Sequence, residues 1–160
     1  MFSFLKKNGC VNVSAPVNGV VKEIETVNDP VFAQKMMGDG LAIEYSDGDV
    51  YAPISGIVSS IILPSCHAFG IHSDEGVDVL VHVGLETVNL KGEGFKLLKQ
   101  QGDRVLAGER VIEVDYNLLK NKNVDLITPI VITNSNEFKI LSKAQGIVRA
   151  KDNLLKLKKV

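Results

Sequence analysis

The chain has 160 residues, of which 45% are hydrophobic and 23% charged, so it is long enough and apolar enough for one globular domain. Its net charge of -1 excludes a general affinity for polyanions such as nucleic acids. No apolar run approaches the ~20 residues that span a membrane, and the first residues become charged too early for a signal peptide. We therefore expect a cytoplasmic protein.

Short runs of alternating apolar and polar residues recur along the chain, with Gly, Pro, Asn or Asp at nearly every junction. Strands are predicted over residues 17–25, 41–45, 56–62, 67–72, 77–83, 110–114 and 129–133. Brief helices are predicted over 93–101, from the i, i+3 spacing of Phe95 and Leu98, and over 115–122, where Asp115 suits an N-cap. The predicted fold is all-β, a compact antiparallel β-sandwich or barrel with one or two very short helices.

The N-terminus is predicted to differ from the rest of the chain, with residues 1–10 a flexible segment and residues 11–160 a single domain. Residues 1–7 combine Phe and Leu side chains with two lysines. Seven residues form only a marginal helix in water, which favours a frayed terminus. The alternative is a weak contact of residues 1–7 with an anionic membrane surface.

A short repeat links two of the predicted strand entries. Ala-Pro-Val-Asn-Gly-Val-Val from residue 15 resembles Ala-Pro-Ile-Ser-Gly-Ile-Val from residue 52, at an offset of 37 residues. A repeat of this kind indicates a structural duplication, although Pro and Gly are also common at strand entries in unrelated β proteins.

Two of the three histidines flank a predicted hairpin turn. Residues 73–76, Ser-Asp-Glu-Gly, are polar and turn-forming, and they lie between two apolar runs that contain His67 and His82. If a two-residue turn joins Ser73 and Gly76, paired residues sum to 149, so His67 lies opposite His82. Directly opposed residues have Cβ atoms ~4.5–5.5 Å apart. The spacing therefore predicts that the two imidazoles touch.

The same register gives both histidines apolar neighbours. It places Phe69 and Ile71 on the face of His67, and Leu80 on the face of His82. Apolar surroundings favour the neutral imidazole, whose free nitrogen is a nucleophile or a metal ligand. The pattern favours a functional histidine pair, and histidines packed in the core are the alternative.

Several motifs follow one another in a characteristic order. Residues 67–95 contain His-Ala-Phe-Gly-Ile, Ser-Asp-Glu-Gly-Val, Val-His-Val-Gly-Leu-Glu-Thr-Val and Leu-Lys-Gly-Glu-Gly-Phe, preceded by Asp-Pro-Val-Phe-Ala from residue 29 and followed by Thr-Pro-Ile-Val from residue 128. From about residue 11 onward the chain resembles the glucose-family enzyme IIA of the bacterial sugar phosphotransferase system. The resemblance implies an antiparallel β-sandwich called a duplicated hybrid motif. It also implies a relay in which phospho-HPr gives its phosphoryl group to a histidine, which passes it to the IIB domain of a sugar permease.

The resemblance also implies roles for individual residues. His82 matches the phosphoryl acceptor and donor, His67 its phosphoryl-stabilising partner, and Ser65, where the family usually has threonine, a residue that orients His67. The residues expected to form the docking rim for partners are Phe32, Phe69, Val83, Glu86 and Val88. No cofactor is required for such a relay, because positioning and charge stabilisation carry phosphoryl transfer.

Two other classes remain as alternatives. The first is a zinc hydrolase or zinc-binding module with His67 and His82 as ligands, but catalytic zinc needs three protein ligands and no third one is evident. A zinc ion that bridges the two histidines and a carboxylate of a regulatory partner stays open. The second is a regulatory binding protein without relay activity, against which the presence of both histidines argues.

Overall fold

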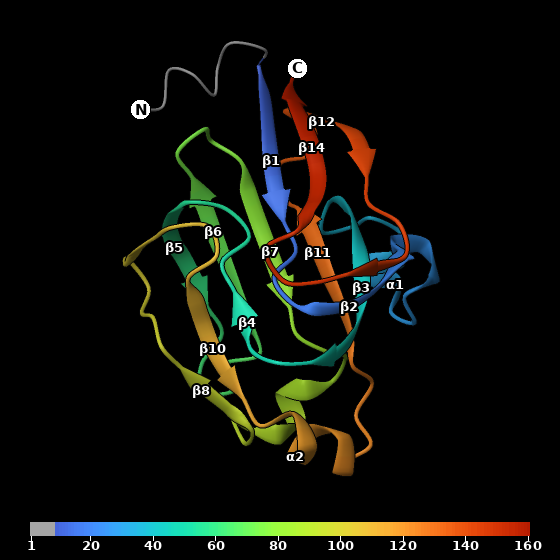
Figure 1. Ribbon diagram of the computed structural model, residues 1–160, viewed down its shortest axis with the longest axis vertical. Coiled ribbons are helices and arrows are strands. Elements are labelled where there is room, and N and C mark those ends of the chain that lie inside the picture. The colour runs from blue at the N-terminus through green and yellow to red at the C-terminus, as the bar shows by residue number, and fades with distance from the viewer. Residues whose placement is uncertain (1–8) are drawn as a thin grey trace.

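Antiparallel β-strands form nearly all of the regular structure (Figure 1). The computed structural model describes residues 9–160. The largest sheet has eight strands in the order β13-β2-β3-β11-β7-β6-β5-β9. Its strands are, in chain order, β2 (Asn18–Glu23), β3 (Asp39–Asp47), β5 (Gly56–Ile61), β6 (Ala68–Ser73), β7 (Asp78–His82), β9 (Arg104–Val105), β11 (Ile127–Ile132) and β13 (Ile147–Val148).

Two small sheets and four helical turns complete the structure. The sheets have the orders β1-β14-β12 and β4-β10-β8. Their strands are β1 (Cys10–Ser14), β4 (Val50–Tyr51), β8 (Phe95–Leu97), β10 (Arg110–Val114), β12 (Phe138–Lys143) and β14 (Asn153–Lys159). The helical turns within residues 9–160 are η2 (Ile24–Thr26), α1 (Pro30–Ala33), η3 (Thr87–Leu90) and α2 (Tyr116–Asn121). The large sheet ends in free edges at β13 and β9, so the predicted all-β sandwich is confirmed and a closed barrel is not formed.

The two predicted helices have different outcomes. The one at 115–122 is confirmed as α2, whose N-cap Asp115 accepts a hydrogen bond from the Leu118 N–H at 3.1 Å. The one at 93–101 is wrong, because this segment contains β8, which pairs with β10 through Phe95 opposite Val114 and Leu97 opposite Ile112. The prediction for residues 1–7, including the membrane contact, concerns residues outside those that the structure describes.

The 37-residue repeat corresponds to a local two-fold arrangement of the backbone. The Ser14 N–H donates to the Pro53 carbonyl at 2.8 Å, and the Tyr51 N–H donates to the Pro16 carbonyl at 2.8 Å. Each residue of the second bond is the counterpart, 37 positions away, of a residue in the first. The flanking strands repeat the relation, because β13 pairs with β2 as β9 pairs with β5. The predicted duplication is therefore present in the hydrogen-bonding pattern.

The β6–β7 hairpin has a register one residue away from the predicted one. The Ser73 N–H donates to the Val77 carbonyl at 2.8 Å, so the loop has three residues, 74–76, and Gly76 has a left-handed φ of 91°. His82 lies opposite Ala68, and every pair sums to 150 instead of 149. The predicted two-residue turn is wrong, because the tetrapeptide also suits a three-residue loop with Gly in the left-handed position.

The large sheet carries apolar side chains on both faces. The main core contains Ile71 and Phe69 of β6 together with Val81 of β7, so the predicted grouping of these β6 side chains with His67 is wrong. On the other face, a smaller cluster includes residues of η2 and α1 and Leu85, which precedes η3. Its buried members are Ile24, Val27, Phe32, Ala42, Leu85 and Val131, with Leu80 packed against them. Because alternate residues of β7 share a face, His82 lies on the side of Leu80 and this second cluster.

Candidate functional site

The segment before β3 carries an aromatic ring to His82. Asp29 caps α1 by accepting a hydrogen bond from the Val31 N–H at 3.0 Å, and Pro30 occupies the first helical turn. The short helix places Phe32, only 4% exposed, with its ring centroid 5.1 Å from that of His82 in an edge-on arrangement. Phe32 therefore covers part of the imidazole with an apolar surface.

The two histidine rings are in contact, as the sequence predicts, but not as members of one regular ladder. Their centroids are 4.7 Å apart with an interplanar angle of 82°. His67 precedes the first residue of β6 and follows Cys66, whose φ is 56°. The Val83 N–H donates to the His67 carbonyl at 2.7 Å. The irregular backbone at residues 66 and 67 therefore turns the His67 ring toward His82, although the register of the hairpin differs from the predicted one.

Ser65 binds the Nδ1 atom of His67. The Ser65 Oγ and the His67 Nδ1 are 2.6 Å apart and hydrogen-bonded, and both residues are buried, with exposures of 2% and 4%. A buried hydrogen bond of this kind restricts the rotation of the imidazole about its χ2 angle. The structure thus brings Ser65, His67 and His82 together, since His67 contacts both of the other side chains.

A backbone carbonyl determines the orientation of His82. The His82 Nδ1–H donates to the Gly84 carbonyl at 2.7 Å. A carbonyl only accepts hydrogen bonds, so this contact requires the proton on Nδ1 and leaves the Nε2 lone pair free. Gly84 is not among the site residues that the sequence predicts, although a glycine two residues after a strand histidine is a visible signal for such a turn.

The environment keeps both imidazoles neutral at pH 7. Burial, and in second place the charge of a protonated His82, lower the pKa of His67 to about 4. Burial also lowers the pKa of His82, while the Gly84 carbonyl and the carboxylate of Asp29 oppose this shift. Asp29 is also absent from the predicted site residues, although its position before a Pro at a helix start is a signal for it.

The buried, neutral His67 predicts a loss of stability in acid. Below pH 6.5 the unfolded chain binds a proton at His67 that the folded protein does not bind until about pH 4, so the free energy of unfolding falls as the pH falls. At pH 5 this contribution is about 2 kcal/mol. Urea denaturation at pH 7 and pH 5 should show a larger loss for the parent than for a His67→Gln variant. Equal losses would mean that His67 is not held neutral. The exposed His72, replaced in the same way, is the matched control.

The five residues of the predicted docking rim differ in exposure. Phe69 and Val83 lie in the main core, with exposures of 1% and 0%, so a partner at the surface does not reach them. Phe32 contacts His82 from a largely buried position. Glu86 and Val88 are exposed, Val88 at 49%, at the start of η3 and close in sequence to His82.

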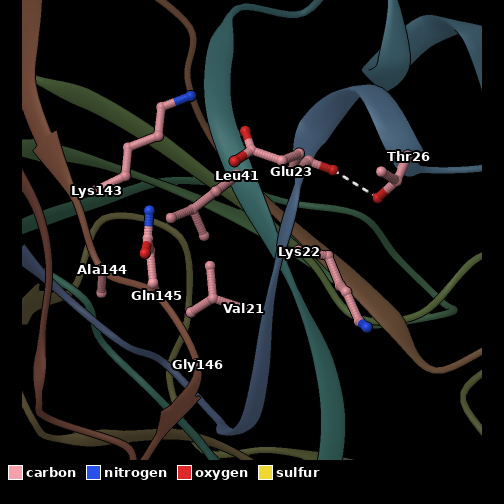
Figure 2. A pocket seen from close by; sticks show the side chains of 9 residues that line it. All are labelled: Val21, Lys22, Glu23, Thr26, Leu41, Lys143, Ala144, Gln145 and Gly146. Carbon is pink, nitrogen blue, oxygen red and sulfur yellow. Dashed lines mark hydrogen bonds between the residues drawn. The ribbon is translucent and has the colours of Figure 1, made fainter.

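The histidine pair is not part of a metal cluster within residues 9–160, and it lies outside the cavity drawn in Figure 2. Residues 9–160 contain no group of three or more His, Cys, Asp or Glu side chains that could hold a metal ion. That cavity has a volume of about 280 Å³ and lies between β2 and the segment that joins β12 to β13. Figure 2 shows the side chains that line it. Its lining residues include Lys22, Leu41 and Lys143 but neither histidine. Within residues 9–160, no helix is long and apolar enough to cross a membrane.

Comparisons with known proteins agree on one family. Residues 11–138 match the family described as phosphoenolpyruvate-dependent sugar phosphotransferase system, EIIA 1. The chain is 45% identical, over 82% of its length and 75% of the relative's, to the glucose-specific EIIA component of Halalkalibacterium halodurans. It is 40% identical to part of the glucose-specific EIICBA component of Staphylococcus carnosus, over 91% of this chain and 22% of that protein.

A solved structure supports the same assignment. The glucose permease IIA from Mycoplasma capricolum superimposes with a TM-score of 0.86 at 35% identity, over 92% of this chain and 95% of that one. Sequence family, curated relatives and three-dimensional fold therefore coincide over the part of the chain that holds the histidine pair. The chain belongs to the EIIA 1 family of the phosphoenolpyruvate-dependent sugar phosphotransferase system, and it is a phosphocarrier of that system.

Proposed function

We propose that His82 accepts the phosphoryl group from phospho-HPr and passes it to the IIB domain of a membrane sugar permease, in the cytoplasm. The observation that supports this assignment most directly is the hydrogen bond from the His82 Nδ1–H to the Gly84 carbonyl, which leaves a neutral Nε2 with a free lone pair. The fused EIICBA relative in Staphylococcus carnosus is consistent with a permease as partner.

The transfer step is a displacement at phosphorus. The lone pair of His82 Nε2 forms the new P–N bond while the bond between phosphorus and the donor breaks, and the electron pair of that bond stays on the donor. The Nδ1–H of His82 remains bonded to Gly84 throughout. Transfer to the IIB domain is the same displacement with His82 as the leaving group.

His67 supports the transfer by donating a hydrogen bond. If the Ser65 hydroxyl donates to the His67 Nδ1, the proton of the neutral His67 ring lies on Nε2. That N–H is then available to a phosphoryl oxygen of phospho-His82, since the two rings are in contact. Donors of this kind stabilise charge on the equatorial oxygens during transfer.

The surroundings of His82 suit a labile intermediate. Phe32 covers one side of the ring and reduces the access of water to a phosphohistidine. Glu86 and Val88 are exposed, follow His82 closely in the sequence, and are the rim residues that we expect a docking partner to contact. Two successive partners must bind and leave, which requires transient contacts of modest area.

A labelling experiment tests the proposal. The purified chain is incubated with labelled phosphoenolpyruvate, enzyme I and HPr, and the labelled residue is identified by mass spectrometry under conditions that preserve phosphohistidine. Label on His82 that is discharged by a IIB domain supports the relay. Label on any other residue contradicts the assignment.

The histidine pair also limits how the protein can bind zinc. Two neutral ring nitrogens fall one short of the three protein ligands that catalytic zinc uses. We infer that zinc binds at His67 and His82 only where a regulatory partner adds a carboxylate. Calorimetry with zinc alone should therefore detect no binding at the histidine pair of the isolated chain. A micromolar zinc site that is present in the parent and lost in His82→Ala would contradict this inference.

A further inference from the structure

Two buried threonines hold both polar atoms of one peptide unit next to His82. The Thr87 hydroxyl donates to the Val83 carbonyl at 2.6 Å. The N–H of the same peptide unit, on Gly84, donates to the Thr128 hydroxyl oxygen at 3.3 Å. Both threonines are 0% exposed, so no solvent contact replaces either bond when a hydroxyl is removed. The plane of the Val83–Gly84 peptide is thus fixed from two sides.

The next peptide unit carries the carbonyl that binds His82. Gly84 has a left-handed φ of 73°, and its carbonyl accepts the hydrogen bond from the His82 Nδ1–H. The N–H at the other end of this unit, on Leu85, donates to the Asp125 carbonyl at 2.9 Å. If the Val83–Gly84 peptide were free to rotate, the φ angle of Gly84 would no longer be fixed, and the Gly84 carbonyl would be held in direction only at the other end of its peptide unit, by the bond from Leu85 to Asp125.

Thr128 is oriented for this task by the backbone just before β11. Its hydroxyl donates to the Leu126 carbonyl at 3.1 Å, which leaves a lone pair for the Gly84 N–H. Continuing the register in which Ile130 pairs with Val81 places Thr128 opposite Val83, directly beside the turn. Thr87 reaches the same turn from η3. Two segments more than 40 residues apart therefore converge on one peptide unit.

We propose that Thr87 and Thr128 are positioning residues that determine which nitrogen of His82 carries the proton. They act through the Gly84 carbonyl, which selects the Nδ1–H form and so presents Nε2 as the nucleophile. This inference rests on the proposed role of His82 as acceptor. Without the two hydroxyls, the carbonyl loses its fixed direction, the Nε2–H form becomes populated, and that form has no lone pair at the reacting nitrogen.

The experiment compares Thr87→Val and Thr128→Val with the parent and with the Ser variants at both positions. Valine retains the shape of threonine without the hydroxyl, whereas serine retains the hydroxyl. The matched control is Thr133→Val, because Thr133 is exposed and directly follows β11, the strand that contains Thr128. The first measurement is the ¹⁵N chemical shifts of the His82 ring nitrogens in the unphosphorylated protein at pH 8. The second is the rate of labelling by phospho-HPr.

We expect Nδ1–H in the parent, in both Ser variants and in Thr133→Val, and a mixture of the two neutral forms in both Val variants. Labelling by the Val variants should fall about threefold to tenfold, as expected for the loss of one hydrogen bond, in proportion to the Nδ1–H fraction. An Nε2–H ring in the unchanged protein would overturn the proposal even if neither Val variant folds. So would an unchanged Nδ1–H ring in a folded Val variant.

The two failures are distinguishable. If His82 is not the acceptor, labelling persists in the absence of His82, whereas the ring shifts of His82 still respond to the threonine substitutions. If the threonines have no positioning role, the ring shifts do not respond, whereas the label still maps to His82. The nitrogen shifts also separate positioning from general destabilisation, because a merely less stable fold does not change the tautomer of its folded state.

Discussion

Replacing His82 by alanine is expected to abolish labelling from phospho-HPr while the protein stays folded. The variant removes the only nitrogen that the Gly84 carbonyl orients for attack, and no side chain at position 82 can then form the P–N bond. The substitution leaves the main core intact, because His82 lies at the margin of the second cluster. Labelling is measured with phosphoenolpyruvate, enzyme I and HPr, and folding by circular dichroism and thermal unfolding.

The matched control is His72→Ala on the same hairpin. His72 is exposed and paired with Asp78 through its Nδ1, away from the site, so its removal should leave the rate and the extent of labelling unchanged. Undiminished labelling of a folded His82→Ala protein would contradict the assignment of the acceptor. Loss of labelling in both variants would mean that the hairpin, not the imidazole, is required.

Replacing His67 by glutamine is expected to separate acceptance from onward transfer. The glutamine amide keeps an N–H near the phosphoryl group, so His82 should still be labelled. Delivery to a cognate IIB domain should slow by a factor of about 10², the scale on which a lost oxyanion donor acts, because the amide lacks the rigid orientation that Ser65 imposes on His67. The measurement is a single-turnover discharge of the purified phosphoprotein by the IIB domain.

Ser65 provides a graded control for this result. Ser65→Ala removes the hydroxyl bonded to the His67 Nδ1 and should slow the discharge less than His67→Gln does, whereas Ser65→Thr retains a hydroxyl and should stay close to the parent. Discharge of His67→Gln at the parent rate would show that His67 is a packing residue only. An equal loss in Ser65→Ala and Ser65→Thr would show that packing, not the hydroxyl, matters at this position.

Part of the candidate site follows directly from local sequence. The two histidines lie close together because a short polar turn joins their strands, and a hairpin brings residues at similar distances from its turn into contact. The contact is confirmed even though the predicted register is wrong. The loop length was not decidable from 73–76 alone, since Ser-Asp-Glu-Gly forms either a two-residue or a three-residue loop. The sequence places Phe69 on the face of the histidines, whereas the observed register places it opposite Val81, in the main core.

The helix predicted over 93–101 failed for a related reason. A short segment with Phe95 and Leu98 three residues apart satisfies a helical pattern, but the pairing of Phe95 with Val114 decides its conformation. Short apolar segments of this length take the structure that their tertiary partners impose. At 115–122, by contrast, the capping residue is local, and the prediction is confirmed by the hydrogen bond from the Leu118 N–H to Asp115.

Alternation, turn residues and the 37-residue repeat were sufficient, from the sequence by itself, to determine an antiparallel all-β fold, a duplication and a pair of adjacent histidines. These features depend on neighbours within one hairpin or on a repeated pattern. Only the tertiary structure decided the contact of Phe32 with His82, the burial that lowers the pKa of His67, and the convergence of Thr87 and Thr128 on Gly84. These depend on residues that are distant in sequence, and burial, hydrogen-bond direction and tautomer are properties of the surroundings that no local pattern contains.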